Sequence, residues 1–292
     1  MAVRTSIRGA VQSPEQIARY RNALARMKTI GDDRGFEWFA SVHGLPFTIW
    51  CEHGTLLFLP WHRAFLYYFE LALQTRLGPR FSLVEPAVPG FADLGLLWWD
   101  WASDESHQEG IPPDFANEQI DGQPNPLAGS QIASCPGGDQ VTVGVWSAAL
   151  LSLIRNHHNP NIRVAISPTD PPRTRRASGP PDDLPRQSTL DNFILPEASF
   201  ASFSGALEQV HDDVHGWVGG SMSVVPTSAY DPIFWSHHTM IDRLWYVWQI
   251  GPRGQNPSPN LMNTVLTPFP RTVADTLSIQ RLGYEYAVQI GV

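Results

Sequence analysis

Histidine is the residue type in this chain with the clearest pattern for chemistry: there are ten histidines, and three of them are spaced as metal ligands. His211 and His215 are four residues apart, which places both imidazoles on one face of a helix. His238 lies on the apolar stripe of the next predicted helix. These three imidazoles can therefore converge on one metal ion.

A second group of three histidines precedes this one in the chain. His43 ends a predicted helix, His53 lies on the loop that follows, and His62 lies in the first turn of the next helix. A single histidine on an apolar face is more often a hydrogen-bonded core residue than a ligand. The same placement on four helices favours ligands, so we expect a second site made of three histidines.

Two sites of this composition, with no carboxylate ligand, favour copper. Calcium and magnesium prefer oxygen ligands, and the Glu-x-x-His pairs of di-iron helix bundles are absent from the sequence. Zinc can bind three histidines and a water, but two such sites facing each other would be unusual. Copper binds imidazole more strongly than its first-row neighbours. The sequence therefore predicts two copper ions, with a zinc hydrolase as the weakest alternative.

Five segments have the apolar periodicity of helices, and four of them carry these histidines. N-cap residues followed by proline mark two of the starts, and a glycine follows most of the ends. The expected helices run from Ser13 to Met27, from Phe36 to Gly44, from Pro60 to Gly78, from Leu207 to Gly219 and from Asp231 to Gly251.

The intervening stretches are long and irregular, notably 103–141 and 167–188, and the second of these is expected to be a mobile surface loop. We therefore predict a mainly α fold, with a four-helix bundle core that carries a dicopper centre, long irregular loops and little β structure. Some short strand pairing near the termini is compatible with the sequence. His107, His157 and His158 match no ligand pattern and are expected at the surface.

Composition limits the class of protein. The 292 residues are 42% hydrophobic and carry a net charge of −8, which predicts one globular domain over 1–292 and argues against nucleic acid or an anionic membrane as partner. No apolar run is long enough for a transmembrane helix, and no signal peptide is visible, so a cytoplasmic location is expected. The two cysteines are too few for a disulfide scaffold.

Three stretches of the chain resemble the tyrosinase and polyphenol oxidase family. Residues 53–63 (HGTLLFLPWHR) are similar to its first copper-binding motif, and residues 211–220 (HDDVHGWVGG) with 231–245 (DPIFWSHHTMIDRLW) are similar to its second. Residues 98–101 (WWDW) resemble a further family segment. The resemblance implies a type-3 dicopper site, in which one copper is bound by His43, His53 and His62 and the other by His211, His215 and His238.

The resemblance also implies roles for two carboxylates. Glu208 resembles the glutamate that, with the residue after His211, orients a water that takes the proton of a phenol. That next residue is Asp212 here, where the strongest monophenol hydroxylases commonly have asparagine, so the rate on monophenols is left open. An exposed helical carboxylate is the alternative reading of Glu208.

Further side chains are implied to lie around the metal pair. Cys51 stands two residues before His53, a spacing that resembles a thioether cross-link between them; a free thiol or a disulfide to Cys135 are the alternatives. Gly216 and Val225 are expected at the substrate rim. Asp242 is expected to bind the outer nitrogen of a ligand imidazole, or else to pair with Arg243 at the helix surface.

The implied activity is the oxidation of phenols, o-diphenols or both to o-quinones by O2. An o-aminophenol oxidase on the same site and a hemocyanin-like O2 carrier are the alternatives. Only 54 residues follow His238, so no C-terminal lid domain and an open site are expected. The expected partners are a small phenol and O2, a copper chaperone is a candidate partner, and no oligomeric state is predicted.

Overall fold

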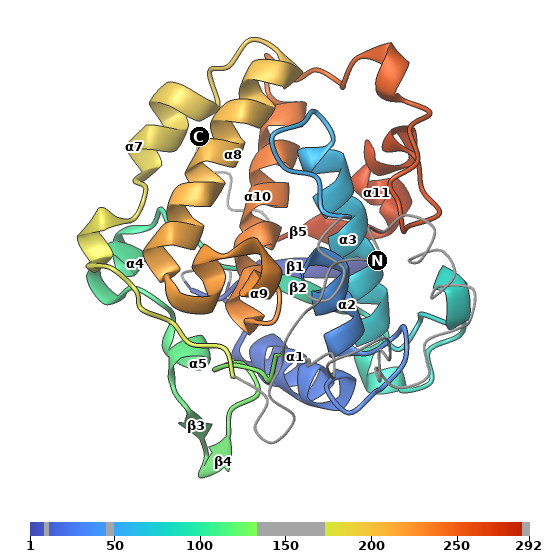
Figure 1. Ribbon diagram of the computed structural model, residues 1–292, viewed down its shortest axis with the longest axis vertical. Coiled ribbons are helices and arrows are strands. Elements are labelled where there is room, and N and C mark those ends of the chain that lie inside the picture. The colour runs from blue at the N-terminus through green and yellow to red at the C-terminus, as the bar shows by residue number, and fades with distance from the viewer. Residues whose placement is uncertain (9–11, 45–49, 133–172, 288–292) are drawn as a thin grey trace, which may run out of the picture.

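A computed structural model describes residues 1–8, 12–44, 50–132 and 173–287 (Figure 1). Helices dominate these residues, and the four helices predicted to carry histidines are all present. The mainly α prediction is confirmed. The four are α2 (Phe36–His43), α3 (Phe58–Leu73), α8 (Phe200–Val218) and α10 (Pro232–Ile250).

Capping residues set several of the helix ends as the sequence predicts. In α1 (Pro14–Met27) the Ser13 side chain accepts a hydrogen bond from the backbone of Gln16, and at α10 Asp231 does the same for Ile233. Helix α3 differs from the prediction, because it ends before Gly78. The backbone of Thr75 has a φ of 59°, a left-handed conformation that a continuing helix does not allow.

A small parallel sheet joins distant parts of the chain. The central strand β1 (Ala2–Ser6) pairs with β2 (Leu94–Trp98) on one side and β5 (Tyr284–Tyr286) on the other. The expected strand pairing near the termini is therefore confirmed. Helix α10 packs against β2, α3 and α8, so the sheet supports the helix that carries His238 (Figure 1).

Short elements fill the segments between the long helices. The hairpin of β3 and β4 projects from the rest of the fold in Figure 1. The remaining bounds are α4 (Asp104–Glu109), α5 (Pro113–Ala116), β3 (Gln119–Ile120), β4 (Gln123–Pro124), α7 (Gln187–Thr189), a π-helix (Leu190–Ile194), α9 (Val225–Ser228) and α11 (Ile279–Leu282).

The expectation of a surface position is wrong for His107. His107 lies on α4 instead of a loop and is buried, with Nε2 3.3 Å from the carbonyl of Pro185. The described part of 167–188 lies mostly at the surface, as expected, and Arg176 joins it to the fold through an ion pair of 2.6 Å with the buried carboxylate of Asp231. Its mobility stays a prediction. Cys135, His157 and His158 lie outside the described residues.

An aromatic core packs against the histidines of the ligand helices. The rings of Phe69 and Trp235 stack 3.5 Å apart between α3 and α10, and Phe65 stacks on His43 with 6.1 Å between ring centroids. Tight packing of this kind fixes side-chain rotamers. No helix in the described part of the chain is long and apolar enough to cross a membrane.

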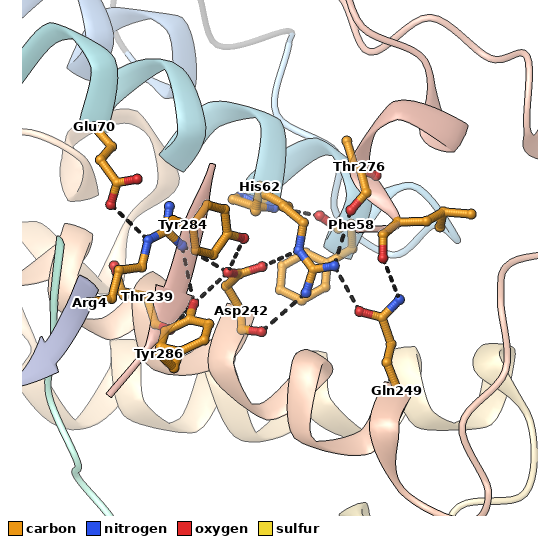
Figure 2. A network of polar contacts seen from close by, with 12 residues as sticks. Arg4, Phe58, His62, Glu70, Thr239, Asp242, Gln249, Thr276, Tyr284 and Tyr286 are labelled. Carbon is orange, nitrogen blue, oxygen red and sulfur yellow. Dashed lines mark hydrogen bonds and ion pairs between the residues drawn. The ribbon is translucent and has the colours of Figure 1, made fainter. Parts of the chain in front are cut away.

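A buried polar network fastens the sheet to the ligand helices (Figure 2). Arg4 of β1 donates to Glu70 of α3 over 2.8 Å and to Asp242 of α10 over 2.9 Å. Tyr284 of β5 donates to the same Asp242 carboxylate over 2.7 Å. The strands near both ends of the described chain are thereby joined to the helices that carry His62 and His238.

Candidate metal centre

One histidine trio has its nitrogens arranged around a single point. The Nε2 atoms of His211 and His215 on α8 lie 3.1 and 3.2 Å from Nε2 of His238 on α10. Three nitrogens that each bind an ion at about 2.0 Å would be separated by a little more than 3 Å. This spacing therefore fits one metal ion bound by three imidazoles.

The second trio forms a similar triangle. The ring centroids of His43, His53 and His62 are separated by 5.2–5.6 Å. The Nε2 atoms of His43 and His62 are buried and have no hydrogen-bond partner among the described residues. A buried nitrogen without a partner is costly, and a metal ion bound by both would remove that cost.

The two trios face each other closely. The rings of His62 and His238 stack with 4.6 Å between centroids, and those of His53 and His211 with 6.0 Å. Nitrogens of His43, His62 and His238, which come from both trios, lie within 4.8 Å of one another. The arrangement therefore suits a pair of neighbouring metal ions instead of two separate sites.

The electrostatics keep these imidazoles neutral and able to bind metal. Burial lowers the pKa of every histidine in both trios, and it brings the pKa of His215 to about 4. Nδ1 of His62 lies 2.8 Å from the Phe58 carbonyl, and Nδ1 of His215 lies 2.8 Å from the Met222 carbonyl. These carbonyls hold the proton on Nδ1 and leave the Nε2 lone pair for the metal.

The expectation for Asp242 needs correction. Its contacts are Arg4, Arg63 and two tyrosines, and among the described residues no imidazole hydrogen-bonds to it. The alternative prediction, a pairing of Asp242 with Arg243 at the helix surface, is also wrong, because Asp242 is buried and binds these other partners. The carboxylate that does contact a ligand imidazole is Asp212, whose Oδ1 lies 3.0 Å from Nδ1 of His211.

Glu208 lies at the junction of the two trios. It is on α8, 9% exposed, and its Oε1 accepts a hydrogen bond of 2.6 Å from the backbone of Gly54, next to His53. Burial, followed by the charge of Asp212, raises the pKa of its carboxyl group. The structure therefore places Glu208 beside the metal centre, and the alternative of an exposed helical carboxylate is wrong.

Cys51 lies close to the histidines of its trio. Its Sγ is 3.3 Å from the carbonyl of His43, and it shares a cluster with His43 and His53 in which the ligand atoms lie within 4.8 Å of one another. Burial raises the pKa of the thiol to about 12. The thioether to His53 stays a prediction, and the alternative disulfide involves Cys135, outside the described residues.

The residues expected at the substrate rim are exposed. Gly216 follows His215 on α8, and a Cβ added to it would meet no atom within 4 Å. Val225 is 42% exposed and begins α9, whose Ser228 hydroxyl lies 3.5 Å from Nδ1 of His43. Both positions are therefore open to solvent, and their place at the substrate rim stays a prediction.

Sequence reasoning left two neighbours of the trios without a defined role. His237 is fully buried, and its ring stacks on that of His211 with 5.1 Å between centroids. Phe234 lies 4.0 Å from the ring of His238 and 4.7 Å from that of His43. The apolar stripe of α10 includes Phe234 but not His237, and neither position distinguishes a packing residue from a ligand.

Comparisons with known proteins agree with this geometry. The family model described as the common central domain of tyrosinase matches residues 33–250. The chain belongs to the tyrosinase family. Members of this type-3 copper family include both oxidases and hemocyanins, and a domain of this type binds two copper ions, which the two histidine trios are suited to hold.

Individual relatives come from both groups. The chain is 26% identical to hemocyanin units G and H of Sepia officinalis, over 81% of this chain and 36% of that protein. It is 29% identical to a tyrosinase of Hahella, over 81% of this chain and 47% of that protein, so it spans less than half of either relative. A functional unit of octopus hemocyanin has the same fold, with a TM-score of 0.67, 22% identity, and coverage of 99% of this chain and 68% of that one.

Proposed function

We propose that the chain is a copper-dependent oxidase that uses O2 to convert phenols, o-diphenols or both to o-quinones. The observation that supports this best is the exposed edge of the metal centre. His53 and His215 keep part of their surface accessible, and Gly216 and Val225 are exposed. A flat phenol ring can approach such an edge, whereas an oxygen carrier needs access only for O2.

The chain's own residues would bind the ring and accept its proton, while bound copper would supply O2 binding and the oxidation of the ring. A phenol has an ordinary pKa of about 10, so a base must assist its ionisation. The raised pKa of Glu208 makes it a stronger proton acceptor, directly or through a water. Asp212 lies four residues further along the same helix and would help to orient that water.

Asp212 also bears on which phenols react. Its Oδ1 contacts Nδ1 of His211, and its side chain is 62% exposed. A negative charge at the edge of the site would disfavour the phenolate that forms there when a monophenol loses its proton. We therefore propose stronger activity on o-diphenols than on monophenols.

Two other functions use the same ligands. An o-aminophenol oxidase would need the same exposed edge, and an O2 carrier is favoured by the similarity to the hemocyanin of Sepia officinalis. Small phenols and O2 are the partners proposed here.

Oxygen uptake by the copper-loaded protein tests the proposal. A simple monophenol and the matching catechol would each be supplied, with metal-free protein as control. Uptake with catechol, alone or with the monophenol, is the expected result. No uptake with either would contradict phenol oxidation. Uptake with an o-aminophenol alone would then support the second candidate, and reversible O2 binding without turnover would support the carrier.

A further inference from the structure

The loop that carries His53 is joined to the opposite half of the metal centre by one carboxylate. The backbone N–H of Gly54 donates to Oε1 of Glu208 over 2.6 Å, although the two residues are 154 positions apart in the chain. Glu208 lies on α8, three residues before His211. A hydrogen bond between two segments so far apart in the chain fixes their relative position, and a buried donor left without an acceptor is costly, so this contact can restrain the loop.

His53 depends on such restraint more than the other histidines of the two trios. Residues 50–57 form no helix or strand, whereas the other five histidines are on helices. Within the loop, Thr55 donates to Glu52 over 3.0 Å and Leu57 donates to Thr55 over 3.1 Å. The end of the loop also accepts backbone hydrogen bonds from Phe58 and Trp61 of the adjoining α3. Among the described residues, the loop itself donates to other elements from Gly54, to Glu208, and from Cys51, to the carbonyl of His43.

The backbone conformation of Gly54, the donor in this contact, favours glycine. Gly54 has a φ of +66°, a left-handed conformation that favours glycine, and a Cβ added there would meet no atom within 4 Å. The backbone conformation, and not lack of space, therefore requires glycine. This conformation directs the N–H of Gly54 toward α8 while His53 stacks on His211.

We propose that Glu208 is a positioning residue that holds the His53 loop against α8 and thereby sets His53 relative to His211. This role rests on the proposed copper centre, but it is separate from proton transfer. Holding Gly54 requires only an acceptor oxygen, which glutamine also has. Accepting a proton from a phenol requires the carboxylate. The two roles are therefore distinguished by replacing Glu208 with glutamine or with alanine.

The test compares Glu208→Gln, Glu208→Ala and a control, Asp213→Ala, which removes an exposed carboxylate from the same helix. Each copper-loaded protein is mixed with a chelator, and the release of each copper ion is followed. We expect Glu208→Ala to release one of its two copper ions about 10- to 100-fold faster than wild type. Glu208→Gln should stay within about threefold of wild type, and Asp213→Ala should match wild type.

A second variant tests the donor side. Gly54→Ala, which keeps Glu208 but disfavours the left-handed backbone, should also accelerate the release of one copper ion. Thermal unfolding of the metal-free proteins shows whether the variants fold, since the proposed effect is on one metal site and not on the whole domain.

Each outcome separates this role from the proposed function. Release from Glu208→Ala at the wild-type rate would overturn it, as would equal acceleration by Glu208→Gln or equal loss of both ions. A wild-type chain that binds no copper would overturn the copper centre itself, and this role with it. Loss of oxygen uptake in Glu208→Gln while both ions are retained would support both the proton role and the positioning role.

Discussion

The guanidinium of Arg63 donates to the carboxylate of Asp242, and the two residues belong to the helices of different histidine trios. Arg63 directly follows His62 on α3, and Asp242 is four residues, about one helical turn, beyond His238 on α10. Both side chains are buried. The pair therefore holds the two ligand helices together close to the metal centre.

The charges around this pair are balanced. Arg4 and Arg63 face Glu70 and Asp242, all of them buried. Burial opposes ionisation of Asp242, but the charges of Arg63 and Arg4 outweigh it and lower the pKa of its carboxyl group. Removing one member would leave an uncompensated buried charge, which costs far more than losing an exposed ion pair.

Asp242→Asn should therefore destabilise the protein by about 3–5 kcal/mol, because Arg4 would keep Glu70 but the buried guanidinium of Arg63 would have no carboxylate partner. Urea unfolding of the metal-free protein measures this difference. Asp213→Asn, which changes the same charge at an exposed site on α8, is the control and should change stability by less than about 0.5 kcal/mol. A loss below about 1 kcal/mol in Asp242→Asn would mean that the network is not a major source of stability.

The helices were predictable because their signals are local. Ser13 and Asp231 act as N-caps within three residues of the groups they bind, and His211 and His215 share a helical face through their spacing. The four ligand helices and the convergence of the trios follow from such signals. Tertiary contacts are different. Arg4 reaches Asp242 across 238 positions, and no local pattern specifies that pair.

Asp242 illustrates this limit. The position of Asp242 one turn after His238 correctly indicates the inner face of α10. Two arginines on other elements, however, bind its carboxylate. A charged guanidinium binds a carboxylate more strongly than a neutral imidazole does. His107 was misplaced for a similar reason. The Pro- and Gly-rich surroundings indicate a loop, yet Ser103 caps a short helix that packs His107 inside.

Single-ligand variants should separate the two metal ions. His43→Ala removes a ligand of one trio and His215→Ala a ligand of the other, so each variant should bind one copper ion tightly and the double variant none. Metal analysis after removal of loosely bound ions measures this. His107→Ala, a buried histidine outside both trios, serves as control and should retain two. Retention of both ions in His43→Ala would contradict the assignment of the first trio.

The chain's one lysine should make stability rise with pH above neutrality. Lys28 donates to the carbonyls of Pro126 and Gly129, and burial lowers its pKa to about 7. Between that value and the unfolded pKa of about 10.4, the unfolded chain binds a proton that the folded chain does not. Stability therefore increases with pH in this window, by at most about 1.4 kcal/mol per pH unit.

Lys28→Met should remove this increase. Urea unfolding between pH 7 and pH 9.5 would show a flatter dependence in the variant than in wild type. Arg26→Met, at an exposed position in the last turn of α1, two residues before Lys28, should keep the wild-type slope. Identical slopes for Lys28→Met and wild type would show that Lys28 stays protonated in the folded protein throughout this range.

Gly216 should control which phenols reach the metal centre. It lies exposed in the last turn of α8, and a side chain added there meets no atom within 4 Å, so Gly216→Leu should fold normally and bind copper as wild type does. Because the added side chain would border His215, we expect the KM for a phenol with a large ring substituent to rise about tenfold. The KM for unsubstituted catechol should change little.

Gly205→Leu is the matched control, since Gly205 is an exposed glycine of the same helix that also has no atom within 4 Å of an added Cβ. Both substitutions replace glycine in a helix by a better helix former, so both should stabilise the fold by about 0.5–1 kcal/mol. Only Gly216→Leu should change the ratio of the two KM values. An equal change of that ratio in both variants, or none in either, would place Gly216 outside the path of the substrate.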